Sequence, residues 1–180
     1  MRNEPVHDHA LITRYFRPMR RALFVLSVLL SACGSEHGNG DLCTHVFTPY
    51  PDLVSDRMRS PANGVFLDAM ALYSQQDYAG ATTGLEHYLR DRTADKSARL
   101  YLACCYLVLE KPFDAELQLD KLEQSSQKEN FSDQCEWYTV VCWLCSDQRE
   151  RALEGAQAIA RAPRHTYKQE AAELVKAMTP

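Results

Sequence analysis

The chain has 180 residues, of which 46% are hydrophobic and 24% charged, and this composition is typical of a single globular domain. Its formal net charge is −4, but residues 1–32 hold five arginines against two acidic residues, which leaves −7 on the rest. An acidic body excludes a nucleic-acid binder, because affinity for phosphate backbones requires clustered Lys and Arg, and the composition also excludes a polytopic membrane protein.

Residues 1–32 have the pattern of a secretory signal peptide. Arginines at positions 17, 20 and 21 precede an apolar run from Ala22 to Leu30. This run is about half of the ~20 residues that a membrane-spanning helix requires, and small residues follow it, as at a signal-peptide cleavage site. Met19 begins a compact basic region of its own, so the sequence leaves open whether Met1 or Met19 is the start.

The signal ends in Leu30-Ser31-Ala32-Cys33, which closely resembles the lipobox of bacterial lipoproteins. The resemblance implies that Cys33 receives a diacylglyceryl group, that cleavage precedes it, and that two or three acyl chains anchor the protein. It also implies a periplasm-facing envelope protein, and Gly34 favours the outer membrane because some bacteria use Asp at this position for inner-membrane retention. The alternative is an ordinary cleaved signal peptide in which Cys33 has no role.

Residues 33–61 are predicted to be the lipidated cysteine followed by a flexible tether. Three glycines near its start and three prolines further on interrupt any regular element. Cys43 and His45 lie in this segment, but two residues cannot complete a zinc shell, which normally has four ligands. We therefore expect a loop here and no metal site.

Beyond Pro61, apolar residues recur at helical spacing and the pattern repeats along the chain. When the sequence is shifted along itself by one period, Ala69 falls on Ala103 and Ala81 on Ala115, and a second, slightly longer shift places Ala115 on Ala152. The spacing predicts helices over 62–75, 78–91, 94–109, 112–125, 131–146, 148–161 and 165–178. The small residues are expected where the two helices of a pair touch.

A period of about 34 residues, with two helices and these small residues in each copy, resembles the tetratricopeptide repeat. No copy carries the family's early Trp or its Gly. The resemblance covers about Ala62 to Met178 and implies an all-α fold, a right-handed superhelix of helical hairpins with a concave side. We expect about three repeats in domain 62–180, and the unpaired last helix should cap the open end through Ala171, Leu174 and Met178.

No catalytic motif is present: GxGxxG, GxxxxGK[ST], HExxH and GxSxG are all missing from the sequence. Acidic pairs lie at predicted helix starts, where they favour the positive end of the helix dipole. We therefore expect no enzyme, no cofactor, no metal and no small-molecule substrate.

Six cysteines follow Cys33, and secretion together with an even number permits disulfides. Cys142 and Cys145 have the CxxC spacing, but they lie near a predicted helix C-terminus, where the helix dipole disfavours the thiolate. A thiol redox or metal-binding protein using this pair is kept as an alternative, although small buried hydrophobic residues are the simpler interpretation.

The tetratricopeptide resemblance implies that a protein or peptide partner binds the concave side, along the first helix of each pair. Carried onto this sequence, it predicts a partner-binding groove formed by Phe66, Met70, Tyr73, Tyr101, Cys104, Leu107, Trp137, Tyr138, Val141 and Leu144. Anchors for a partner should be partly solvent-accessible in the free protein, Trp137 above all. The expected function is protein–protein interaction in the cell envelope, and an accessory role in an outer-membrane assembly complex is the second possibility.

Overall fold

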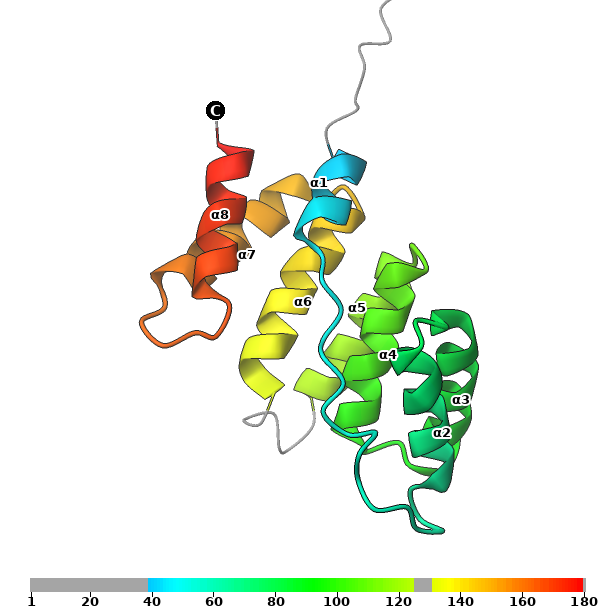
Figure 1. The fold of residues 1–180 in the computed structure, drawn as a ribbon. Helices are drawn as coiled ribbons and strands as arrows, with labels where there is room; N and C mark the ends of the chain where they lie inside the picture. Colours follow the sequence, from blue (N-terminus) through cyan, green and yellow to red (C-terminus); the bar gives the residue numbers. More distant parts are fainter. Residues whose placement is uncertain (1–38, 125–130, 180) are drawn as a thin grey trace, which may run out of the picture. The chain divides into compact units, whose positions relative to one another are not determined.

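A computed structural model describes residues 39–124 and 131–179, all of which belong to one unit. The predicted signal peptide, Cys33 and the start of the predicted tether lie outside the described residues. The elements are helices α1 (Asn39–Val46), α2 (Gly64–Ser74), α3 (Tyr78–Asp91), α4 (Lys96–Val108), α5 (Pro112–Glu123), α6 (Ser132–Cys145), α7 (Arg149–Arg161) and α8 (Lys168–Met178) (Figure 1).

The predicted fold class is confirmed, since the described part of the chain is all-helical and consecutive helices pack as a solenoid of hairpins. The seven predicted helices correspond to α2–α8, each within three residues at either end. Pro112 starts α5 at a position where its missing N–H costs nothing. No helix among the described residues is long and apolar enough to span a membrane.

The turn inside each hairpin repeats the same backbone geometry. Gln76, Glu110 and Asp147 have positive φ angles of 64°, 57° and 62°, and they recur at the spacing that the sequence repeat predicted. The amide that follows each of them bonds back to the carbonyl of Leu72, Tyr106 and Trp143, at 2.8–2.9 Å. This left-handed termination gives a hydrogen bond to a free carbonyl at the end of the first helix, and it turns the chain towards the second helix. The hairpin is therefore the repeating unit.

Small residues lie where the helices of a pair touch, as the repeat spacing predicted. Ala81, Ala115 and Ala152 on the second helices are completely buried. Close approach is confirmed at Gly155, where an added Cβ would lie 2.6 Å from Cγ2 of Val140 on α6. A larger side chain at such a contact would push the two helices apart.

The C-terminal helix covers the end of the solenoid. Ala171, Leu174 and Met178 are buried on α8, which packs on α7. The loop before α8 is held to α6 because the backbone N–H and the hydroxyl of Thr166 both donate to Asp133, at 2.7 and 2.6 Å. The predicted cap is thus formed.

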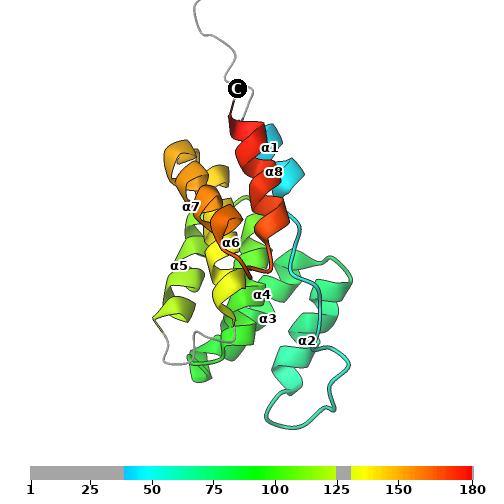
Figure 2. The same ribbon diagram turned by 90° about the vertical axis from the view of Figure 1, so that its left-hand side faces the viewer.

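The segment predicted as a flexible tether is ordered over its described part. Residues 39–46 form α1, and residues 47–54, which we call the strap, run extended past α6 and α4 before a loop leads into α2 (Figure 1; Figure 2). The packed unit therefore begins before the boundary expected at residue 61 and includes these residues.

Candidate binding groove

The strap lies along the first helices of the three hairpins and is held by tyrosine hydroxyl groups. Tyr138 on α6 donates to the carbonyl of Thr48 at 3.0 Å, and Tyr73 on α2 donates to the carbonyl of Tyr50 at 2.7 Å. Tyr101 on α4 donates to the carbonyl of Pro51 at 3.1 Å and accepts the amide N–H of Leu53 at 3.0 Å. All four hydrogen bonds are made to main-chain atoms of the strap and none to its side chains.

Aromatic rings complete the contact. Phe47 meets Tyr138 edge to face with centroids 6.3 Å apart, and the ring centroid of Tyr50 lies 5.7 Å from that of Tyr101. Tyr101 also meets Tyr73 edge to face at 5.2 Å. Edge-to-face contact is a favourable geometry for aromatic pairs. Tyr73 and Tyr101 are thus in ring contact with each other, and Tyr138 is in ring contact with Phe47 of the strap; we call these three tyrosines the floor.

The sequence of the strap favours an extended backbone. A residue before proline is restricted to extended backbone, and this applies to Thr48 and Tyr50, which precede Pro49 and Pro51. Proline also lacks an N–H, so the carbonyls become the polar groups that the groove must satisfy. Little conformational entropy is lost when such a segment binds.

Asp52 holds the last residues of the strap in a turn beside α2. Its carboxylate accepts the amides of Val54 and Ser55 at 2.9 and 3.0 Å, and it also accepts the hydroxyl of Ser74. Partial burial works against ionisation, but hydrogen bonds from Ser55, Ser74 and the two amides outweigh it and lower the pKa of Asp52. Val54 is buried beyond it, whereas Leu53 is exposed.

The floor hydroxyls stay protonated at physiological pH. Burial raises the pKa of Tyr101 to about 12, and burial also raises the pKa values of Tyr73 and Tyr138. A protonated phenol can donate to a carbonyl, whereas a phenolate cannot. Strap binding through these bonds is therefore insensitive to pH in the physiological range.

The structure corrects the expectation that the groove residues are accessible in the free protein. The strap or neighbouring helices cover all of them, so that Phe66, Met70, Tyr73, Tyr101, Cys104, Leu107, Trp137, Tyr138, Val141 and Leu144 are all buried. Trp137 is 3% exposed and stacks on Tyr167, with ring centroids 5.6 Å apart. It is a core residue and no anchor for a partner. Of the ten, Tyr73, Tyr101 and Tyr138 bind the strap through their hydroxyl groups, and the Cys104 sulfur is hydrogen-bonded to the backbone of Tyr50.

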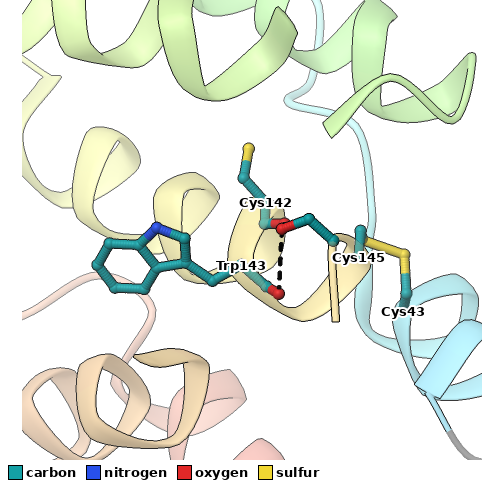
Figure 3. Close-up of a disulfide and its surroundings, with 5 residues drawn as sticks. Cys43, Cys142, Trp143 and Cys145 are labelled. Atoms are coloured by element: carbon teal, nitrogen blue, oxygen red, sulfur yellow. Dashed lines mark hydrogen bonds between the residues drawn. A yellow bond between two sulfur atoms is a disulfide. The ribbon is translucent and has the colours of Figure 1, made fainter. Parts of the chain in front are cut away.

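A disulfide fixes the strap's beginning to the third hairpin. Cys43 on α1 is bonded to Cys145 at the end of α6, across a sequence separation of 102 residues (Figure 3). Both residues are half-buried. Cys142, one turn earlier on α6, carries its sulfur away from this bond (Figure 3). The CxxC pair considered from the sequence is therefore not the bonded pair.

The remaining thiols are buried, and their raised pKa values disfavour the reactive thiolate. Cys104, Cys105, Cys135 and Cys142 are free, and burial raises the pKa of the first three to about 12. Burial also raises the pKa of Cys142 well above its ordinary value. Reactive cysteines have the opposite property, a lowered pKa with partial exposure. No cluster that could hold a metal occurs among residues 39–124 and 131–179.

A separate hollow of about 420 Å³ lies between α5, α6 and α7. Its wall includes Glu116, whose carboxylate accepts the indole N–H of Trp143 at 2.7 Å. The guanidinium of Arg151 lies over the same indole, 4.3 Å from its centroid. These contacts tie the polar wall of the hollow together as a cation–π and hydrogen-bonded stack.

No protein-family model matches this sequence, and comparisons with curated proteins and with solved structures find no significant match. Its function is therefore inferred from its own geometry.

Sequence reasoning missed Cys43 and the strap. Two signals were present: the Thr-Pro-Tyr-Pro run at 48–51, which favours an extended backbone, and an even number of cysteines after Cys33. Neither signal states where in the fold the segment binds.

Proposed function

We propose that this chain is a lipid-anchored cell-envelope protein whose helical repeat domain, of tetratricopeptide type, mediates protein–protein interaction without catalysis. The proposed ligand is an extended polypeptide segment bound along the first helices of the hairpins. The anchor is the diacylglyceryl group on Cys33, and the proposed location is the periplasmic side of the outer membrane.

One observation carries the binding proposal: the hydroxyls of Tyr73, Tyr101 and Tyr138 hold main-chain carbonyls of an extended segment. Proline-containing extended segments are commonly recognised by aromatic grooves of this kind. The strap is such a segment, and it occupies the groove in cis. Because the bonds reach the backbone, a different extended sequence could make the same bonds.

The cysteines support the proposed compartment. The half-buried pair Cys43–Cys145 is oxidised, and disulfides form in oxidising compartments such as the periplasm. Palmitate labelling tests the anchor directly. Wild-type protein should take up label and fractionate with membranes, and Cys33→Ser should do neither. A labelled Cys33→Ser protein would contradict the lipoprotein assignment.

Peptide binding tests the groove. In full-length protein purified in detergent, Cys43→Ser, Phe47→Ala and Tyr50→Ala together remove the disulfide and both strap rings. We expect this triple variant to bind a fluorescent peptide of residues 46–55 saturably, as measured by anisotropy. Circular dichroism should show that its helices are intact.

The matched control keeps every ring and removes hydroxyls. Adding Tyr138→Phe to the triple variant should weaken peptide binding about 2- to 10-fold, which corresponds to one net hydrogen bond. Adding Tyr101→Phe should weaken it more, because the Tyr101 hydroxyl makes two bonds to the strap. A folded triple variant that binds no peptide would refute the groove as a binding site. An accessory role in an outer-membrane assembly complex is a narrower form of the same proposal, and peptides from candidate members would then replace the strap peptide.

A further inference from the structure

We infer that the Cys43–Cys145 disulfide is a redox gate on the groove. While it is intact, the strap closes the groove, and its reduction lets an extended, proline-punctuated segment of a partner protein replace the strap. This inference rests on the proposed peptide-binding function and adds its regulation.

Covalent bonds hold both ends of the strap. Cys43 fixes the beginning to the end of α6, and the loop that follows residue 54 continues directly into α2 at Gly64. A segment fixed at both ends cannot leave the groove fully, and it rebinds at a high effective concentration. A partner segment must compete with that rebinding, so the oxidised groove is closed.

Reduction would change one end only. The strap would keep its link to α2, and its own contacts are modest: the floor hydroxyl bonds, the Asp52 turn and partly buried rings. Among the strap residues, Val54 alone is buried. Phe47 and Tyr50 pack against the core but are only partly buried, so Val54 is the one fully buried apolar side chain that holds the strap independently of the disulfide.

Among the cysteines of the described domain, the two in the disulfide are the more exposed ones. Cys43 and Cys145 are half-buried, whereas the four free thiols are buried. Cys142 is the nearest thiol in sequence, but its sulfur points away and its raised pKa disfavours the thiolate (Figure 3). Cys142 is therefore not positioned for thiol–disulfide exchange with the Cys43–Cys145 bond, and the reductant must be another molecule.

The reductant that fits is a dithiol protein of thioredoxin type. Its thiolate attacks one sulfur of the pair, the Cys43–Cys145 bond breaks, and a mixed disulfide forms. Its second thiol then displaces the bound cysteine. The dithiol thereby becomes a disulfide. Its two electrons and two protons are transferred to Cys43 and Cys145, which become thiols.

The partner's chemistry follows from the strap it would replace. The floor offers three hydroxyl donors for carbonyls and aromatic faces for rings, which suits prolines alternating with an aromatic residue. Tyr50 between Pro49 and Pro51 has this arrangement. A segment rich in charge or without proline would bind less well, because it loses more conformational entropy for the same backbone bonds.

The test compares wild-type full-length protein, oxidised and after treatment with a dithiol, using the fluorescent peptide of residues 46–55 as probe. Oxidised protein should bind the peptide weakly, because the strap tethered at both ends competes with it. Reduced protein should bind at least about 10-fold more tightly, though less tightly than the triple variant, since its own strap still competes at one end. Cys43→Ser should bind alike in both conditions. In parallel, hydrogen exchange at the Leu53 amide should accelerate on reduction.

Each other outcome overturns the gate. If the triple variant binds the peptide and reduced wild type does not, the gate is wrong and the proposed function stands. If neither binds, both proposals fail. If reduction melts the helices at ambient temperature, the disulfide is a structural staple and no gate. If oxidised and reduced protein bind equally, the strap opens without reduction and the gate is wrong.

Discussion

The hydroxyl group of Tyr138 on α6 donates a hydrogen bond to the carbonyl oxygen of Thr48, which precedes it by 90 residues. This bond joins the segment before the repeats to the third hairpin, and the Cys43–Cys145 disulfide joins the same two regions. The face formed by the first helices of the hairpins is consequently covered by the protein's own chain. Any partner that uses this side must first displace the strap.

The number of free thiols tests the Cys43–Cys145 disulfide. In a Cys33→Ser chain, we expect Ellman's reagent to titrate the four free thiols in denaturant without reductant, and six after reduction. In the folded protein the four should react slowly, because burial raises their pKa values and hinders access. Six thiols in the denatured, unreduced protein would show that the disulfide does not form.

Helix packing can be tested at Ala115 on α5, which is completely buried. Ala115→Leu should overpack the contact and lower the free energy of unfolding by ~1–3 kcal/mol. Lys121→Leu on the same helix is the matched control, because Lys121 is exposed and surface changes usually stay within ~0.5 kcal/mol. Chemical denaturation measures both. Small, equal effects of leucine at Ala81, Ala115 and Ala152 would contradict the repeat alignment.

The helices were predictable from sequence because their contacts are local and periodic. The recurrence of Ala81, Ala115 and Ala152 fixed the hairpin period, and the positive φ values at Gln76, Glu110 and Asp147 follow that period. Helix ends moved by no more than three residues, as expected where capping decides the last turn.

The strap was not predictable in the same way, because distant contacts determine its structure. The eight residues of α1 are too few to show a helical pattern, and a helix of that length is not stable alone. Glycines and prolines around it resemble a linker. Its position depends on contacts with Cys145, Tyr101 and Tyr138, which span sequence separations of 102, 48 and 90. The predicted groove thus included the three tyrosines that bind the strap, but the prediction missed the strap itself.

The hairpin turns offer a stabilising substitution. Glu110 has a φ of 57° between α4 and α5, a conformation that glycine adopts without steric cost. Glu110→Gly should therefore leave the free energy of unfolding unchanged or raise it by up to ~1 kcal/mol. Glu154→Gly in the interior of α7 is the matched control and should lower it by ~1 kcal/mol. Thermal denaturation of the two variants should differ accordingly, and equal losses would refute the turn geometry.

Acid should loosen the loop that precedes α8. Hydrogen bonds from the Thr166 hydroxyl and amide lower the pKa of Asp133 below its ordinary value of 3.8. Because the folded state lowers this pKa, the stabilisation is complete above the unfolded value and is lost as the pH falls through the folded one. Asp133→Asn cannot ionise, though its amide oxygen can still accept the Thr166 amide and hydroxyl, which both donate to one oxygen of Asp133.

The measurement is the difference in melting temperature between wild type and Asp133→Asn across pH. We expect wild type to be the more stable near pH 6, with the difference shrinking as the pH falls below about 4. The change should come with loss of protection at the Thr166 amide, which donates to Asp133. A difference that stays constant down to about pH 2 would mean that the ionised Asp133 carboxylate does not hold the loop.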